Sequence, residues 1–164
     1  MKCRFIFILL FCTSTTSFAQ SKYGIRKINS FFIEHVPGNI RADSVGNPIF
    51  QGPDTIHTVY VETGSNTIKW IAAWKDGKSF SVITTAINER PFVVGVNSRT
   101  NEKIILKPAK GNKLWLLQFD KKATSSKPPV KPKRGEIILQ GRSAGKLFIQ
   151  RVGRSTELET IPSV

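Results

Sequence analysis

Between residues 55 and 119 the sequence consists of short segments rich in β-branched and aromatic residues, each followed by residues typical of turns. The clearest pair is Thr67–Trp74 and Ser79–Thr85, which flank the dipeptide Asp76-Gly77. This dipeptide favours a tight hairpin because glycine accepts a positive φ without a Cβ clash. Such a pattern leaves the chain few ways to fold other than as paired antiparallel strands.

The same pattern predicts further strands on both sides of this hairpin. They cover Ile56–Glu62, Phe92–Val96, Lys103–Lys107, Lys113–Phe119, Glu136–Gln140 and Lys146–Val152, with a short edge strand near Leu158–Ile161. Helical periodicity is almost absent, and consecutive strands usually pair with each other. We therefore predict an all-β protein in which about 8–10 short strands form an antiparallel meander, folded as a β-sandwich or an open barrel.

Some of these segments are apolar on both faces. They are Ile104–Leu106, Leu114–Leu117 and Ile137–Leu139. A strand in a sandwich normally keeps one face in water. The second face must therefore be covered, either by the N-terminal segment or by another chain, and the sequence leaves both possibilities, including oligomerisation, open.

The segment from residue 20 to residue 54 is less regular. A strand near Ser30–Val36 is favoured over a helix because Gly24 and Asn29 weaken the helical alternative. Glycine and proline are then frequent up to residue 54, as in a long loop. We expect an irregular N-terminal segment over residues 20–54 that can contribute an edge strand, followed by one β domain over residues 55–164.

The first 19 residues have the three parts of a secretory signal peptide. Lys2 and Arg4 precede the apolar run Phe5–Cys12, and small residues follow up to Ala19. We predict cleavage between Ala19 and Gln20 and export to the periplasm or the medium of a bacterial-type cell. A membrane-spanning helix needs about 20 apolar residues, so we expect no transmembrane segment in the mature chain.

Metal and cofactor sites lack the residues that they usually need. Both cysteines, Cys3 and Cys12, lie within the predicted signal, so the mature chain would contain no thiol. The two histidines, His35 and His57, have no recognisable set of further ligands around them. We expect neither a metal nor a cofactor.

Catalytic motifs with a fixed spacing are also absent from the sequence. His57, Asp76 and either Ser79 or Ser81 could meet in space as a triad, because triads have no required sequence order. His57 alternates with two valines, however, which is typical of a half-buried histidine at the rim of a sheet. We expect a non-catalytic protein and keep a small hydrolase as an alternative.

The net charge is +14 and is unevenly spread, because six basic residues and no acidic residue lie within Lys121–Arg134, a segment with three prolines. Mutual repulsion and proline favour an exposed loop here. The candidate binding residues are Lys121, Lys122, Lys127, Lys131, Lys133 and Arg134. Because no aromatic residue lies between these cations, we expect an anionic glycan or lipid surface, or another protein, and not nucleic acid.

Trp70 and Trp74 lie four residues apart in one predicted strand, so alternation places them on the same face. Exposed together with Trp115, they would form a platform for sugar rings. The residues between them are apolar, which favours packing in the core instead. The sequence therefore predicts an exported, non-catalytic protein that binds an anionic partner through basic loops, with a carbohydrate-binding module that uses Trp70 and Trp74 as an alternative.

Overall fold

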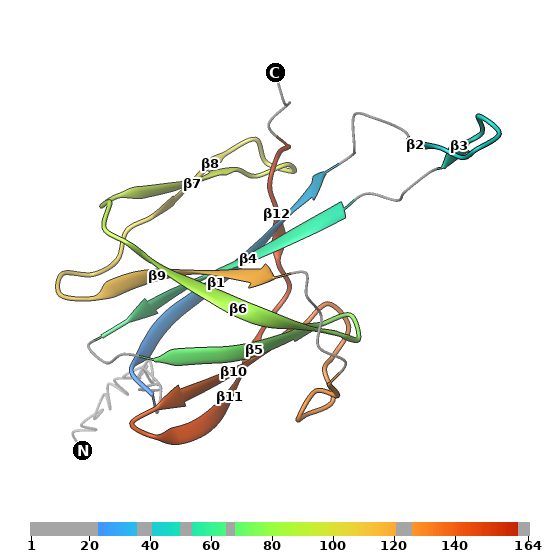
Figure 1. Ribbon diagram of the computed structural model, residues 1–164. Helices are drawn as coiled ribbons and strands as arrows, with labels where there is room; N and C mark the ends of the chain where they lie inside the picture. Colours follow the sequence, from blue (N-terminus) through green and yellow to red (C-terminus); the bar gives the residue numbers. More distant parts are fainter. Residues whose placement is uncertain (1–22, 36–40, 50–53, 65–67, 121–125, 161–164) are drawn as a thin grey trace, which may run out of the picture.

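The computed structural model describes residues 23–35, 41–49, 54–64, 68–120 and 126–160, and within these ranges it contains strands, turns and loops (Figure 1). The strands are β1 (Ile25–His35), β2 (Arg41–Ala42), β3 (Pro48–Ile49), β4 (Asp54–Thr63), β5 (Lys69–Lys75), β6 (Lys78–Ile87), β7 (Phe92–Val96), β8 (Lys103–Leu106), β9 (Lys113–Asp120), β10 (Ile137–Ser143), β11 (Lys146–Val152) and β12 (Thr156–Glu157). The predicted all-β class is confirmed. The predicted signal peptide, residues 1–19, lies outside the described residues.

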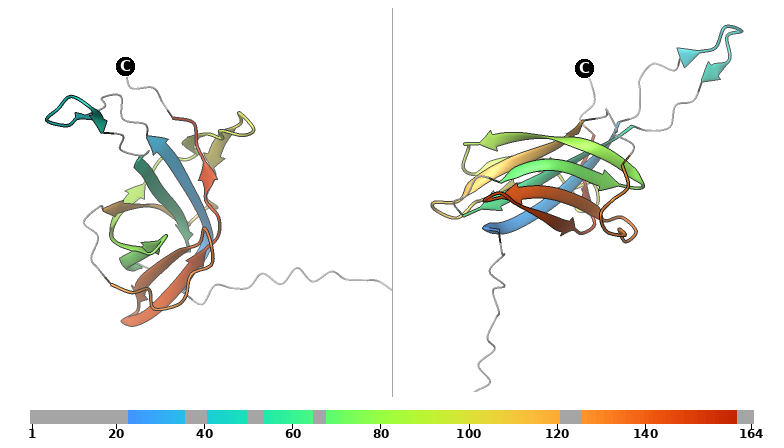
Figure 2. Two further views of the ribbon diagram at one scale, coloured as in Figure 1. Left: turned by 90° about the vertical axis from the view of Figure 1, so that its right-hand side faces the viewer. Right: turned by 60° about the horizontal axis from the view of Figure 1, so that its bottom comes forward.

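Eight strands form one curled sheet in the order β11-β10-β5-β6-β9-β4-β1-β12. Neighbouring strands are antiparallel except β1 and β12, which are parallel. The sheet curls so far that β11 comes into contact with β1, although these strands are not paired (Figure 2). This architecture is consistent with a β-sandwich or an open barrel.

The strand order departs from a simple meander. The hairpins β5–β6, β7–β8 and β10–β11 pair consecutive strands as expected. Elsewhere β9 lies between β6 and β4, and β7–β8 forms a separate small sheet. The hairpin leaves the main sheet because its apolar side chains cover a face of that sheet instead of extending an edge. The N-terminal strand β1 belongs to the main sheet and pairs with β4 along its length.

Two hairpins have the tight turn that their sequence favours. Asp76 and Gly77 adopt φ values of 49° and 76°, which confirms the predicted hairpin between β5 and β6. Ala144 and Gly145 adopt φ values of 47° and 77° between β10 and β11. The second turn is shorter than the five-residue link expected from sequence because β10 continues to Ser143.

The inner face of the curl holds the larger hydrophobic core. Its fully buried members are Val59, Val61, Ala73, Leu117, Ile137 and Leu139. These residues come from β4, β5, β9 and β10, so the core joins strands along most of the main sheet.

A second cluster lies on the outer face, where β7–β8 packs across the main sheet. It contains Phe31, Tyr60, Leu106, Leu114 and Leu158. The strand β9 is therefore apolar on both faces because Leu117 faces the inner core and Leu114 faces this second cluster. The outer face of β9 is covered within the chain by β7–β8 and Leu158, and Phe31 of the N-terminal segment belongs to the same cluster.

A β-bulge in β5 separates the two tryptophans. Gln140 of β10 pairs with Ala72, but the next residue, Gly141, pairs with Trp70, so Ile71 is an extra residue in β5. Trp70 consequently packs in the inner core, while Trp74 lies opposite Ile138 on the outer face. The prediction that both indoles share one face is wrong, because alternation holds only in a strand without a bulge.

Candidate functional site

At one end of the curl, the side chains on the inner face change from apolar to polar. On β4, Val59 and Val61 belong to the inner core, and the two-residue repeat places Thr55 and His57 on the same face. On β1, Phe32 and Glu34 lie directly opposite His57 and Thr55 and therefore face inward too.

Lys75 reaches this polar end from β5, a strand that is not adjacent to β1 or β4 in the sheet. It lies opposite Ile137 of β10, an inner-core residue, and two residues beyond Ala73, which also belongs to that core. The strands thus position Lys75 on the same inner face as His57, at the point where β5 turns into β6.

These residues line a cleft with a volume of about 490 Å³. Its lining comes from the end of β1, the start of β4, the end of β5, the loop before β10 and the segment between β11 and β12. The lining residues are Phe32, Glu34, Thr55, His57, Lys75, Asp76, Arg134, Gly135, Arg154 and Ser155.

The most buried charge in the cleft is the ammonium group of Lys75. The residue is only 8% exposed, and its Nζ lies 2.9 Å from Oδ2 of Asp76. An ammonium group has three donors, whereas Asp76 is its one ion-pair partner among the described residues. Lys75 therefore retains donor capacity for a further acceptor.

Arg134 and Arg154 bring two more cations to the cleft. Neither guanidinium group forms an ion pair within the described part of the chain. The two arginines line the same cleft, and Arg154 lies beside the residue that follows Arg134, because a Cβ atom on Gly135 would lie 3.7 Å from Cγ of Arg154. Guanidinium groups present several donors in a planar fork, an arrangement that suits carboxylate, sulfate or phosphate.

Two buried polar atoms in the cleft wall have no hydrogen-bond partner. They are Nδ1 of His57 and Oγ of Ser155. Burial, and secondarily the positive charge of Lys75, lowers the pKa of His57, while Asp76 acts in the opposite direction. Each of these buried atoms lowers the stability of the fold, because a buried polar group without a hydrogen-bond partner is costly.

The cleft also contains carboxylates. Asp76 is paired with Lys75, and its side chain is 68% exposed. Glu34 is exposed and has no ion-pair partner among the described residues, although it lines the same cleft as two arginines.

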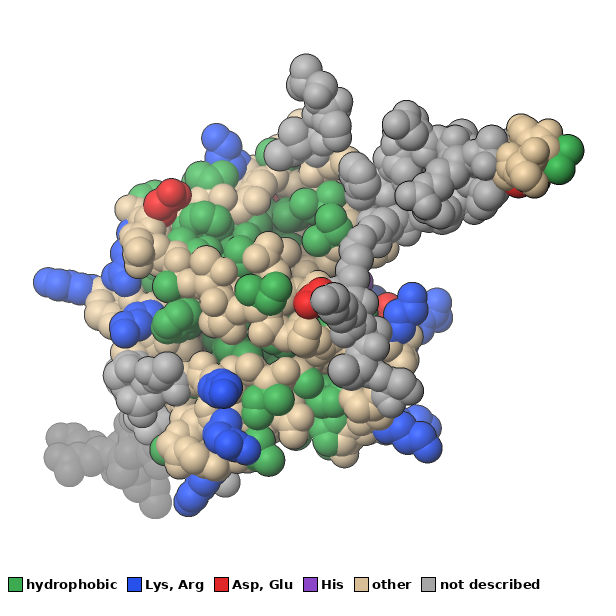
Figure 3. Space-filling view, viewed as in Figure 1, with side chains coloured by type: hydrophobic (Ala, Val, Ile, Leu, Met, Phe, Trp, Pro, Cys, Tyr) green, Lys and Arg blue, Asp and Glu red, His purple; other side chains and the backbone are tan. Residues whose placement is uncertain are grey.

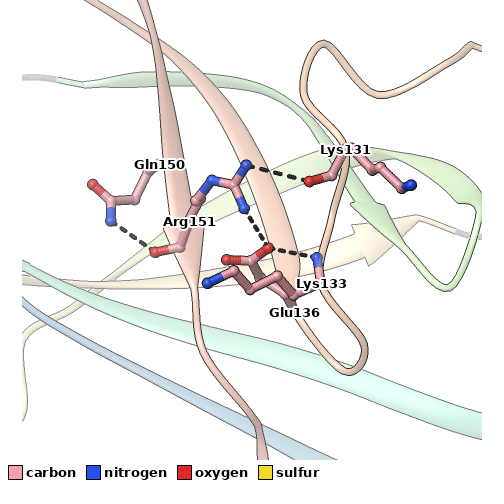
Figure 4. A network of polar contacts seen from close by, with 5 residues as sticks. All are labelled: Lys131, Lys133, Glu136, Gln150 and Arg151. Atoms are coloured by element: carbon pink, nitrogen blue, oxygen red, sulfur yellow. Dashed lines mark hydrogen bonds and ion pairs between the residues drawn. The ribbon is translucent and has the colours of Figure 1, made fainter.

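Two anchors hold the described part of the basic loop, residues 126–136, against the sheet. At one end the indole Nε1 of Trp74 donates a hydrogen bond to the carbonyl oxygen of Ser126, at 3.0 Å. At the other end Oε2 of Glu136 accepts from the backbone N–H of Lys133 and pairs with Arg151, both at 2.8 Å (Figure 4). Arg151 also donates to the carbonyl oxygen of Lys131.

The structure brings only part of the predicted basic site to the cleft. Arg134 lines it, whereas Lys127, Lys131 and Lys133 are exposed along the loop. Lys121 and Lys122 lie outside the described residues.

Sequence reasoning did not assign Lys75, Arg154 and Ser155 to a site. One feature of the sequence could have pointed to this site, namely that Lys75 directly follows the apolar residues of β5. Arg154 and Ser155 belong to no motif.

The tryptophans present no platform. Trp70 is 5% exposed and Trp74 is 4% exposed, on opposite faces of the sheet. Trp115 donates from Nε1 to Oγ1 of Thr63 at 3.0 Å. The indoles therefore act as packing residues and local anchors in this structure.

The proposed serine partners of His57 lie on the other side of the sheet. Ser79 pairs with Trp74, so it faces outward, and Ser81 faces the same way by alternation, whereas His57 faces inward. Ser155 lines the cleft together with His57, but no hydrogen bond joins the two side chains.

Among the described residues, no cluster of three or more His, Cys, Asp or Glu side chains could hold a metal ion. Within the same ranges, no helix has the length and apolar character needed to cross a membrane.

Comparison with known proteins gives no relative from which a function could be transferred. No family model matches the chain, and no curated protein or solved structure is significantly similar to it. The cleft and its chemistry therefore carry the functional argument.

Proposed function

We propose that this protein is a non-catalytic binding protein that takes up an anionic group in the cleft at the polar end of its curled sheet. The observation that carries the proposal is the convergence of Lys75, Arg134 and Arg154 on one cleft. Three cations share it, and only Lys75 has a carboxylate partner among the described residues.

An anion would satisfy several groups at once. It would accept hydrogen bonds from the spare donors of Lys75 and from both guanidinium groups. Because Lys75 is nearly buried, water would screen its attraction to the anion less than that of an exposed lysine. A neutral ligand would leave the same positive charges uncompensated.

The remaining positive charge would help an anion to reach the cleft. Basic side chains lie along much of the outline of the molecule in the view of Figure 3, and Lys127, Lys131 and Lys133 are exposed on the loop that leads to Arg134. Such a field raises the rate of association and weakens with added salt. The anionic group could be part of a glycan or a lipid, as expected from the composition of the basic loop.

The direct test is calorimetric titration of the protein with sodium sulfate and, separately, with inorganic phosphate at pH 7 and low ionic strength. We expect saturable binding that weakens between about 50 and 300 mM NaCl. The double variant Arg134→Ala/Arg154→Ala should bind about tenfold more weakly or worse, because it removes two charged donors.

The matched control is Lys127→Ala/Lys131→Ala, which removes the same charge from the exposed part of the same loop. It should lower the affinity far less than the arginine pair does. Equal losses in the two double variants would show a diffuse charge effect in place of a defined site, and absence of binding to either anion would refute the proposal.

We also propose that the protein acts outside the cytoplasm, in the periplasm or the medium. The support is the predicted signal peptide that ends at Ala19. Expression of the whole chain in a bacterial host, followed by fractionation and N-terminal sequencing, tests this proposal. A product that begins at Gln20 in the exported fraction is expected, and a cytoplasmic product that retains residues 1–19 would contradict it.

A further inference from the structure

The cleft has two poles of opposite charge. Both lie on the inner face, but they come from opposite ends of the strand order. Lys75 is on β5, Arg134 precedes β10 and Arg154 follows β11, so the basic residues belong to the β11-β10-β5 side. Glu34 and Thr55 lie opposite each other on β1 and β4, which form the other side.

The poles do not neutralise each other. No nitrogen of Arg134, Arg154 or Lys75 lies within 4.0 Å of a carboxylate oxygen of Glu34. Asp76 is engaged by Lys75, so Glu34 is the carboxylate in the cleft wall that remains without an ion-pair partner among the described residues. A site that only had to hold an anion would gain nothing from this negative charge, which opposes binding.

We infer that the ligand is a small zwitterion, with its anionic group at Lys75, Arg134 and Arg154 and a primary ammonium group at Glu34. This inference rests on the proposed function, because it assumes that the basic pole holds the anionic group. A primary ammonium group has three donors, and Glu34 and the hydroxyl group of Thr55 are acceptors that lie side by side.

Phe32 supports the same orientation. It lies two residues from Glu34 on the same face of β1, and its ring lies 6.0 Å from the ring of His57. An aromatic face beside a carboxylate stabilises a cation further. The aromatic residue in the cleft wall thus belongs to the acidic pole, where a ligand ammonium group would lie.

The test compares two ligands that differ only in the ammonium group, phosphoethanolamine and ethyl phosphate, by calorimetry at pH 7. The wild-type protein should bind phosphoethanolamine about tenfold more tightly, since a charged hydrogen bond is gained. In Glu34→Gln this preference should disappear, while the affinity for ethyl phosphate should stay the same or rise. Glu89→Gln, an equal change of charge in an exposed loop, should keep the preference.

The failure of this inference differs from the failure of the proposed function. Equal affinity of the wild-type protein for both ligands would overturn the zwitterion and leave anion binding intact. Binding of neither ligand would overturn both. A preference that survives Glu34→Gln, in a variant with an unchanged thermal unfolding curve, would remove Glu34 from the site.

The zwitterion could be a free molecule or a lipid headgroup, and vesicles distinguish these sources. Glu34-dependent binding to vesicles that contain phosphatidylethanolamine, compared with vesicles of phosphatidylcholine alone, would assign a headgroup. Glu34-dependent binding of free phosphoethanolamine without binding to the vesicles would assign a free ligand. Loss of Glu34 dependence in both assays would overturn the inference.

Discussion

The two ends of the inner face differ in chemistry although the same strands build both. On β4, Val59 and Val61 are fully buried in the core, whereas His57, the next inward residue along the strand, has an unpaired nitrogen. On β5, Ala73 belongs to the core and Lys75 carries a nearly buried charge. The apolar end stabilises the fold. The polar end lowers that stability, because it buries a charge and polar atoms that are not fully paired.

Residues at the apolar end are thus expected to stabilise the fold, and residues at the polar end are expected to bind the anion. Substitutions at the apolar end should change the free energy of unfolding and leave the anion affinity of the folded protein unchanged. Substitutions at the polar end should do the reverse. The following variants test this separation.

Leu117→Ala should have the largest effect. Leu117 is fully buried in the inner core, so the truncation leaves a cavity and should lower the free energy of unfolding by about 2–5 kcal/mol. Urea titration measures this loss, and calorimetry on the folded variant should give the wild-type affinity for sulfate. A loss of affinity in the folded variant would contradict the separation of the two ends.

Gly141→Ala should have the next largest effect. A Cβ atom at this position would lie 2.7 Å from Cζ of Phe148 and 3.2 Å from Cε3 of Trp70. Phe148 is itself stacked on Tyr23 at 4.2 Å between ring centroids, so it has little room to move. We expect a loss of roughly 1–3 kcal/mol from overpacking.

Gly153→Ala is the control, because nothing lies within 4 Å of its Cβ position. Its urea midpoint should match that of the wild-type protein. A loss in Gly153→Ala as large as that in Gly141→Ala would show that close packing is not the cause.

Lys75→Met should separate binding from stability in the opposite direction. Methionine keeps the length of the side chain and removes a nearly buried charge, while Asp76 remains solvated. We expect sulfate affinity to fall about tenfold and the free energy of unfolding to stay the same or to rise by about 1 kcal/mol.

The control is Lys78→Met, which changes the exposed lysine that pairs with Lys75 across the turn. It should leave both quantities close to those of the wild-type protein. A strong destabilisation by Lys75→Met would mean that this lysine supports the fold.

His57 should produce the smallest effect, a dependence of stability on pH. Because burial lowers the pKa of His57 in the folded state, the unfolded chain takes up a proton first as the pH falls below about 6.5. Stability should therefore decrease from about pH 6.5 down to the lowered pKa and then level off, and His57→Gln should flatten this part of the curve. Thermal unfolding between about pH 8 and pH 5 measures both.

Bound sulfate should reduce this pH dependence, because an anion favours the protonated imidazole. Identical pH profiles for the wild-type protein and His57→Gln would show that His57 does not titrate differently in the folded state.

The sequence predicts the strands of this protein well because alternation is a local property. The segments Phe92–Val96 and Lys146–Val152 were predicted with the bounds that the structure gives them. Strand order depends on which apolar faces meet, and no local pattern reveals that β9 lies between β6 and β4. The bulge at Ile71 is equally hidden, since it depends on the pairing of β5 with β10.

The candidate site could be predicted only in fragments. Alternation with Val59 and Val61 correctly placed His57 at a half-buried rim position. The high local charge drew attention to Arg134 among five lysines of the same loop, but nothing distinguished it from them. Arg154, which lines the same cleft, lies 20 residues further along the chain, and only the curling of the sheet brings the two together.

The curl leaves a seam between β1 and β11, which touch without backbone pairing. A molecule that contacts both Glu34 and Arg154 would bridge this seam. Binding of the ligand would then raise the resistance of the curled sheet to mechanical unfolding. Force that peels β11 away from β1 would first have to expel the bound molecule.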